Sequence, residues 1–367
     1  MRFLIDCRKY NDSGIGTYIR SVIPRVVKII YPLKVTLLVP KNSNDFIKIF
    51  NDQVDTIVMN NKPFSLGEQF EFLKILNKGD FFWATSLSHP LFYFGPFIAT
   101  IHDVAQLALS VNIVGKFTKI VSYFYLYSIK IKSILLFYNS LFTKSQFHYY
   151  LGSSKAHEIV TPLGVEDWWC ERRAPKYKKV DLTPYFICVG NVRPHKNLNI
   201  LFQAFSAALN LIPHQLVVVG EHEGFRTSVT NFSDLLDALG ERVRFLGRIS
   251  DMDLFEYISN ADALIFPSLY EGFGLPALEA MAAGCPVIAS TAGALPEVCG
   301  EFAAAYFDPT SIDQLAIVMI KHARLSQQAR LNLVELGQEY TKIYNWDKTA
   351  TLTAEAILHI SKTLSAS

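Results

Sequence analysis

The chain has 367 residues, half of them hydrophobic, with a mean hydropathy of +0.20 and a formal net charge of +2. This length allows two domains that each bury a core. The most apolar long window, 121–142, carries Lys130 and Lys132 at its centre, so we expect no membrane-spanning helix.

Strand-like and helical runs alternate along the chain. The strand-like runs are Phe3–Ile5, Val35–Val39, Phe97–Ile101, Ile134–Phe137, Phe186–Val189, Leu216–Val219, Val243–Leu246, Ala263–Phe266 and Val287–Ala289. Helical runs between them include Leu198–Leu209, Leu254–Asn260 and Leu278–Ala283. This alternation predicts an α/β protein with parallel sheets covered on both faces.

The alternation breaks at 168–184, a charged stretch that contains proline and has no periodicity. We therefore predict an N-terminal Rossmann-like domain over 1–170, a linker over 171–184 and a C-terminal Rossmann-like domain over 185–345. The last segment, 346–367, is predicted to be a helix. Ligands of such sheets bind beyond the carboxyl ends of the strands, so site residues should directly follow strands.

Two candidates follow strands of the first domain. Gly14 and Gly16 come after the first strand and a polar loop, but Ile19 stands where a dinucleotide fingerprint has its third glycine. The motif is weak for NAD and suits a loop that approaches some other ligand closely. His102 ends the strand Phe97–Ile101 and could contact a substrate or move a proton, or it could be a satisfied structural residue.

Region 116–155 combines lysine with many aromatic residues, and no acidic residue lies between Asp103 and Glu158. Its lysines are Lys116, Lys119, Lys130, Lys132, Lys144 and Lys155. This composition is typical of a surface that rests on anionic lipid. Ordinary core with solvated lysines is the alternative. Nucleic acid is not expected, because the region has no arginine and no nucleic-acid motif.

The second domain carries cations and carboxylates after its strands. Arg193 and Lys196 follow Phe186–Val189 and could hold a diphosphate; a solvated turn with Asn197 as helix N-cap is the alternative. Glu271 and Glu279 lie eight positions apart across a glycine turn and Pro276. We expect Pro276 at the first helical position and Glu279 in the first turn, beside a helix N-terminus that can bind an anion.

Metal chemistry is not required by the sequence. Asp251 and Asp253 resemble a metal-binding acidic pair, but they follow Ser250 at a predicted helix start, and capping explains them. The five cysteines are scattered without metal or redox spacing, which favours a reducing compartment such as the cytosol. The N-terminal residues do not form a secretory signal. We expect no cofactor and no metal.

These motifs together resemble the retaining glycosyltransferases of family four, which have two Rossmann domains facing a central cleft (GT-B architecture) and use nucleotide-diphosphate sugars. The resemblance covers nearly the whole chain. It rests on SGIGTYIR, IHD at 101–103, TPLGVEDWW, VGNVRPHKNL, the long segment VRFLGRISDMDLFEYISNADALIFPSLYEGFGLPALEAMAAGCPVIAS, and GALPEV. The E-x7-E pattern of Glu271 and Glu279 is its most specific part.

The resemblance implies a role for each matched residue. Glu271, Lys196 and His102 would act on the transferred sugar and the departing diphosphate. The remaining residues would bind the donor: Glu279 at the ribose, Arg193 at the diphosphate, the amides of Phe273, Gly274 and Leu275, Gly14 and Gly16 along the cleft, and Arg248 and Ile249 near the base. Asn191 and His195 replace basic residues of many relatives. The last helix would cross back onto the first domain.

The predicted function is transfer of a hexose, first of all mannose from GDP-mannose, to a lipid-linked or glycan acceptor with retention of configuration. The expected place is the cytoplasmic face of a membrane, in surface polysaccharide or glycolipid synthesis. Two alternatives stay open: a nucleotide-sugar epimerase or hydrolase on the same fold, and a non-catalytic sugar-nucleotide-binding subunit. A nicotinamide dehydrogenase is disfavoured by the incomplete glycine fingerprint.

Overall fold

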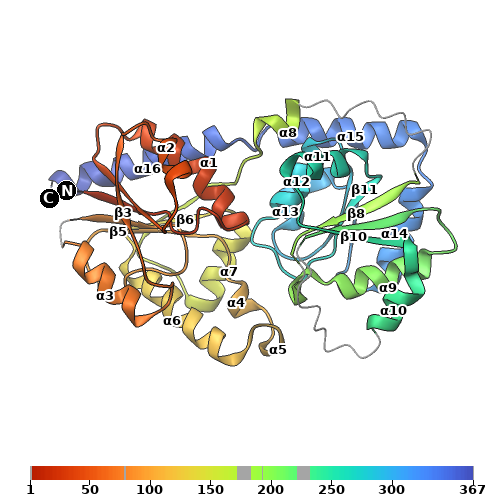
Figure 1. Cartoon of the computed structure of the whole chain (residues 1–367), viewed down its shortest axis with the longest axis horizontal. Coiled ribbons are helices and arrows are strands. Elements are labelled where there is room, and N and C mark those ends of the chain that lie inside the picture. The colour runs from red at the N-terminus through yellow and green to blue at the C-terminus, as the bar shows by residue number, and fades with distance from the viewer. Residues whose placement is uncertain (1, 78–79, 172–182, 192, 221–231, 367) are drawn as a thin grey trace. The chain divides into compact units, whose positions relative to one another are not determined.

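The computed structural model describes residues 2–77, 80–171, 183–191, 193–220 and 232–366. The chain divides into two compact units (Figure 1). The first comprises Met1–Gly164 together with Tyr344–Ser367, and the second comprises Val165–Ile343. Most of the expected linker, 171–184, lies outside the described residues. Each unit is described by itself.

The first unit contains a seven-stranded parallel sheet in the order β3-β2-β1-β4-β5-β6-β7. Its strands are β1 (Phe3–Asp6), β2 (Val35–Val39), β3 (Val54–Val58), β4 (Phe81–Ala84), β5 (Phe97–Ile101), β6 (Leu135–Tyr138) and β7 (His157–Val160). Phe3 in the inner strand β1 pairs with Val35 on one side and Phe81 on the other. The inner strands are mostly apolar because helices cover both faces of the sheet.

The helices of this unit are α1 (Gly14–Ile29), α2 (Asn44–Lys48), α3 (Leu66–Ile75), α4 (Ala105–Ala108), α5 (Val111–Val114), α6 (Lys116–Lys132), α7 (Leu141–Leu151) and α16 (Trp346–Ala366). Helices α1 and α16 pack together on one face of the sheet, and α3 and α6 lie on the other (Figure 1). Serine side chains cap α3 and α7, where Ser65 accepts from the Glu68 amide and Ser140 from the Thr143 amide.

The second unit contains a six-stranded parallel sheet in the order β10-β9-β8-β11-β12-β13. Its strands are β8 (Tyr185–Val189), β9 (Gln215–Val219), β10 (Val243–Gly247), β11 (Ala263–Phe266), β12 (Val287–Ser290) and β13 (Ala305–Phe307). Its helices are α8 (Asp167–Glu171), α9 (Leu198–Ala208), α10 (Phe232–Leu239), α11 (Asp251–Asn260), α12 (Leu275–Ala282), α13 (Leu295–Cys299), α14 (Ile312–Ala323) and α15 (Gln327–Thr341). Helices α9 and α14 pack on each other and on Phe186 of β8, which form its core.

The predicted α/β class with two parallel sheets is confirmed. Four strands were not singled out in the sequence: β3, β4, β7 and β13. Three of these are sheet edges, where a strand is short or half-solvated and its pattern is weak. The fourth, β4, is a buried run of only four residues. No helix within the described part of the chain is long and apolar enough to cross a membrane.

Candidate functional site

The strand order of the second unit reverses between β8 and β11, and this switch point brings Lys196 and Glu271 together. Lys196 closes the short 3-10 turn Pro194–Lys196 that follows β8, and Glu271 lies on the loop that follows β11. Lys196 Nζ is 2.7 Å from Glu271 Oε1 and 5.3 Å from the centroid of the Phe266 ring. Ligands of parallel sheets bind at such switch points, beyond the carboxyl ends of the strands.

The pair is reachable from solvent and is held in place by backbone contacts. The side chains of Lys196 and Glu271 are 20% and 14% exposed. The Leu269 amide donates to the His195 carbonyl at 2.7 Å, which ties the loop after β11 to the turn after β8. Burial, and to a lesser extent the charge of Lys196, lowers the pKa of His195 to about 4. Lys196 is therefore flanked by a neutral imidazole at neutral pH.

Gly293, after β12, supports Glu271 from behind. Its φ is +65°, and a Cβ at this position would lie 2.5 Å from both the nitrogen and the carbonyl oxygen of Glu271. The Ala294 amide donates to the same carbonyl at 2.9 Å. Gly220, with φ +142°, plays a similar part beside Gly190, because a Cβ there would overlap the Gly190 carbonyl. Sequence reasoning missed both; a glycine directly after a strand was a signal that could have identified Gly220.

The N-terminus of α12 lies on the same loop as Glu271. Gly274, with φ +109°, is its N-cap, and a Cβ there would lie 2.6 Å from a methyl carbon of Leu295. The amides of Gly274 and Leu275 belong to the turn that lacks intrahelical acceptors, and neither donates to another of the described residues. Phe273 is buried. The free amides and the helix dipole create positive potential at this point.

The expected start of α12 was wrong by one residue. The helix begins at Leu275, so Pro276 is not its first residue and Glu279 lies in the second turn. The left-handed Gly274 ends the loop and lets the helix begin one residue before the proline.

Glu279 has an unusual environment for a carboxyl group. It is half-buried, and burial raises its pKa to about 7, with smaller contributions from the negative charges of Asp251 and Glu166. The carboxyl group is thus divided between its two protonation states near neutral pH. No group of three side chains able to hold a metal ion is found among the residues described.

The other candidates of the second unit are less constrained. Arg193 is exposed and its carbonyl accepts from the Lys196 amide at 2.9 Å. Arg248, exposed, and Ile249, half-buried, follow the edge strand β10. Asn197 occupies the N-cap position of α9 but does not cap it; its side-chain amide donates to the carbonyls of Pro267 and Pro309.

The capping interpretation of Asp251 and Asp253 is confirmed. Ser250 is the N-cap of α11, and its hydroxyl accepts from the Asp253 amide at 3.1 Å. The same hydroxyl is 2.6 Å from Asp253 Oδ2.

In the first unit, His102 follows β5 and is held in one tautomer. Its Nε2 lies 3.0 Å from the Thr85 carbonyl, which can only accept, so Nε2 carries the proton and Nδ1 bears a lone pair. Burial lowers the pKa of His102 to about 4, so the ring is neutral at physiological pH. It stands edge-on to the Tyr18 ring at 4.9 Å. Gly16 is needed where a Cβ would lie 2.6 Å from the Tyr10 carbonyl, whereas Gly14 faces open space.

Region 116–155 exposes aromatic residues more than charge. On α6, Phe117 and Phe124 are 79% and 65% exposed. Three of the six lysines instead donate to backbone carbonyls of neighbouring segments: Lys119 to Leu107, Lys130 to Leu151 and Lys132 to Leu91. The apolar face of α6 is therefore its main exposed feature, with the lysine ammonium groups at its margins.

Part of the chain is similar in sequence to known glycosyltransferases. Residues 171–339 match the family model described as glycosyl transferases group 1. The O-antigen chain mannosyltransferase B of Escherichia coli is 30% identical over 183 residues, 47% of this chain and 45% of that protein. A GDP-mannose-dependent phosphatidylinositol monomannoside mannosyltransferase of Corynebacterium glutamicum is 28% identical over 204 residues, 51% of this chain and 52% of that protein. The chain thus spans about half the length of these curated relatives.

Solved structures share the fold of the whole chain. HepE of Anabaena, in complex with UDP-glucose, matches with a TM-score of 0.77 at 16% identity, covering 98% of this chain and 100% of that one. WaaG, a glycosyltransferase involved in lipopolysaccharide biosynthesis, matches with a TM-score of 0.72 at 16% identity, covering 97% and 99%. The chain thus has the GT-B fold of these structures. Its part 171–339 resembles the group 1 glycosyl transferases, and its sequence is similar to mannosyltransferases.

Proposed function

We propose that the chain transfers a hexose from a nucleotide-diphosphate sugar to a lipid-linked or glycan acceptor, with retention of anomeric configuration. Mannose from GDP-mannose is the first choice of donor. Mannosyltransferases recur among the relatives, and one of them is GDP-mannose-dependent by name. A nucleotide-sugar donor is further supported by the UDP-glucose complex of HepE. The acceptors named for these mannosyltransferase relatives favour a role in surface polysaccharide or glycolipid synthesis.

The Lys196–Glu271 pair at the switch point of the second sheet carries this proposal. A donor diphosphate placed there would draw the Lys196 ammonium away from Glu271, 2.7 Å distant, and would meet the unpaired amides of Gly274 and Leu275. These fixed positive groups would stabilise the charge that develops as the diphosphate leaves. The released Glu271 carboxylate would then accept hydrogen bonds from hydroxyl groups of the sugar. The acceptor would attack from the face that the diphosphate leaves.

The remaining residues would complete the donor site. Glu279 would accept hydrogen bonds from both ribose hydroxyls. Arg193 would add positive charge at the diphosphate, and Arg248 with Ile249 would lie near the base. His102, neutral with a lone pair on Nδ1, is suited to accept a hydrogen bond from a sugar hydroxyl rather than to donate a proton. Because these groups account for the developing charge, we propose that transfer needs no metal and continues in EDTA.

A thermal-shift screen against UDP, GDP, ADP and their sugars tests this proposal. A donor that binds only the folded protein raises the unfolding temperature, by an amount that grows with the logarithm of its concentration divided by its Kd. Stabilisation by one nucleotide sugar, lost in Glu271→Ala, supports the donor site; no shift with any of them contradicts it. Nucleotide release with and without acceptor then separates a transferase from an epimerase or hydrolase. Binding without turnover over a broad acceptor panel would favour a binding subunit.

We also propose that the first unit rests on the cytoplasmic face of an anionic membrane. The exposed aromatic side chains of α6 support this, since such side chains favour the membrane interface. Phe117→Gln combined with Phe124→Gln should reduce co-sedimentation with anionic vesicles by about tenfold or more, because two aromatic side chains that would insert into the membrane interface are lost. Equal co-sedimentation of the double variant and the parent chain would contradict the proposal.

A further inference from the structure

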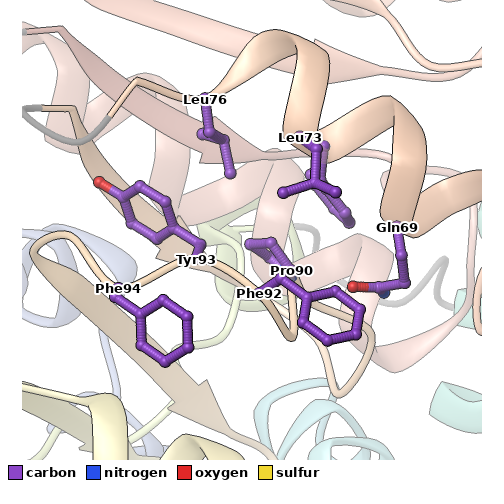
Figure 2. Close-up of a pocket in the computed structure, with 8 residues that line it drawn as sticks. Gln69, Leu73, Leu76, Pro90, Phe92, Tyr93 and Phe94 are labelled. Carbon is purple, nitrogen blue, oxygen red and sulfur yellow. The ribbon is translucent and has the colours of Figure 1, made fainter.

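A cavity of about 400 Å³ opens on the first unit between α3 and the loop that follows β4. Figure 2 shows side chains of the helix pointing toward those of the loop across this cavity. It is lined by Gln69, Phe72, Leu73, Leu76, Pro90, Phe92, Tyr93 and Phe94. The volume lies in the range of small-molecule sites. The cavity belongs to neither the switch point of this unit's sheet nor the donor site of the second unit.

The polar groups of the lining are already occupied. The Gln69 side-chain amide donates to the His89 carbonyl at 3.1 Å and accepts from the Leu91 amide at 2.7 Å. The Tyr93 hydroxyl donates to the Asp80 carbonyl. The wall is therefore mainly apolar, and a polar ligand would lose its hydration and gain few hydrogen bonds. A ligand that fits this cavity has to be apolar.

The rim of the cavity is exposed and apolar. Leu73, Phe92 and Phe94 are 53%, 60% and 84% exposed, although side chains of this size are normally buried. The loop contacts the C-terminal half of α6, where Lys132 donates to the Leu91 carbonyl and His89 Nε2 lies 3.1 Å from the Ser128 hydroxyl. Exposed apolar side chains gathered at the mouth of a cavity mark an interaction site.

One cation lies at the rim. The Lys132 ammonium lies 5.2 Å from the centroid of the Phe94 ring. The carboxylates of Glu68 and Asp80 are already paired, with Arg8 and with Arg2. The Lys132 charge is therefore left to attract a negative group outside the cavity, while the interior favours hydrocarbon.

We propose that this cavity binds one acyl chain of an anionic membrane lipid, whose phosphate lies near Lys132. Such a lipid matches both features: a hydrocarbon chain for the cavity and a negative headgroup for the rim. The rim would face the headgroup region, as is proposed above for the exposed aromatic side chains of α6. The inference deepens the membrane association proposed above and rests on it in part. It can be tested without a membrane, so the two can fail separately.

The test measures binding of dioctanoyl phosphatidylglycerol, below its micelle concentration, to the full chain by calorimetry. Leu73→Arg places a charge at the mouth of the cavity. Phe70→Arg is the matched control, because Phe70 is 65% exposed on the same helix but does not line the cavity. We expect saturable one-to-one binding that weakens at least tenfold in Leu73→Arg and stays within about twofold in Phe70→Arg. A second rim variant, Phe92→Arg, should behave like Leu73→Arg if either variant folds poorly.

Three results would overturn the proposal. The first is no saturable binding of the lipid by the parent chain, which would indicate that the exposed apolar rim contacts a protein partner instead. The second is equal weakening by Leu73→Arg and Phe70→Arg, which would indicate charge at the surface and not a cavity. The third is binding of a short isoprenyl diphosphate but not of the diacyl lipid, which would assign the cavity to the acceptor's own chain.

Discussion

The protonation of Glu279 should control donor affinity near neutral pH. Its pKa is raised to about 7 by burial, with help from Asp251 and Glu166. If the ionised Glu279 carboxylate accepts hydrogen bonds from the two ribose hydroxyls, only the protein molecules with deprotonated Glu279 bind the donor well. That fraction falls from about nine-tenths at pH 8 to about one-tenth at pH 6. The apparent dissociation constant of the donor should therefore rise about eightfold to tenfold over this interval.

Glu279→Gln removes the titration while keeping the size of the side chain. We expect the donor to bind about ten- to a hundredfold more weakly at pH 8, the range for hydrogen bonds to a charged group, and the pH dependence to disappear. The assay is calorimetric titration at pH 6, 7 and 8 with the nucleotide sugar selected by the thermal screen. A sugar diphosphate diester is the right probe, because its phosphates do not titrate in this interval.

Other groups of the site do not obscure the result. Burial lowers the pKa values of His195 and His102 to about 4, so both imidazoles stay neutral from pH 6 to pH 8. Glu256→Gln, an exposed carboxyl change on α11, is the control and should behave like the parent chain. A parent chain whose donor affinity does not change with pH would refute the reasoning. So would a Glu279→Gln variant that keeps both the affinity and its pH dependence.

Three further predictions concern catalysis, backbone support and stability. Lys196→Ala should lower turnover by about a hundredfold or more, because one fixed charge at the leaving group is lost; Lys196→Arg should recover part of it, and near-normal turnover of the alanine variant in a steady-state assay would exclude the role. Gly293→Ala should destabilise the protein by about 1–3 kcal/mol in urea unfolding and impair turnover, since its Cβ would lie 2.5 Å from the Glu271 backbone. Gly240→Ala, also at positive φ but with nothing within 4 Å, is its control, and equal costs would argue against the packing explanation. Glu279→Gln should raise the free energy of unfolding at pH 8 by up to about 3 kcal/mol and leave it unchanged at pH 4.5. The Glu279 pKa is about 7 in the folded chain against 4.5 in the unfolded chain, so the parent chain loses stability as pH rises between these values. If the variant differs from the parent by the same free energy of unfolding at both pH values, the prediction is contradicted.

Much of the second unit was predictable because its chemistry is local. Strand, glycine turn and helix follow one another in the chain around Glu271, so the loop and the helix N-terminus could be predicted before the fold was known. Lys196 was also identifiable, since it directly follows a strand. The start of α12 was predicted less well, because Gly274 and the Leu295 side chain that excludes a Cβ there decide it, and Leu295 comes from another helix.

Sequence patterns were less informative where function depends on packing. The lysines of region 116–155 predict a charged, exposed surface. In the structure, Lys119, Lys130 and Lys132 instead donate hydrogen bonds to backbone carbonyls of other segments. The cavity beside α3 could not be predicted, because its two walls come from separate segments of the chain. The same is true of Gly293, whose importance lies in the Glu271 backbone behind it.

The sequence by itself determined the class of fold, the alternation of strand and helix, and the residue types that can hold a diphosphate and a sugar. These features depend on the periodicity and spacing of neighbouring residues, which the linear order records. Tertiary structure alone decided the contact of Lys196 with Glu271, the raised pKa of Glu279 and the tautomer of His102. Each of these depends on burial and on atoms brought close by sheet order and packing, and a one-dimensional pattern does not specify them.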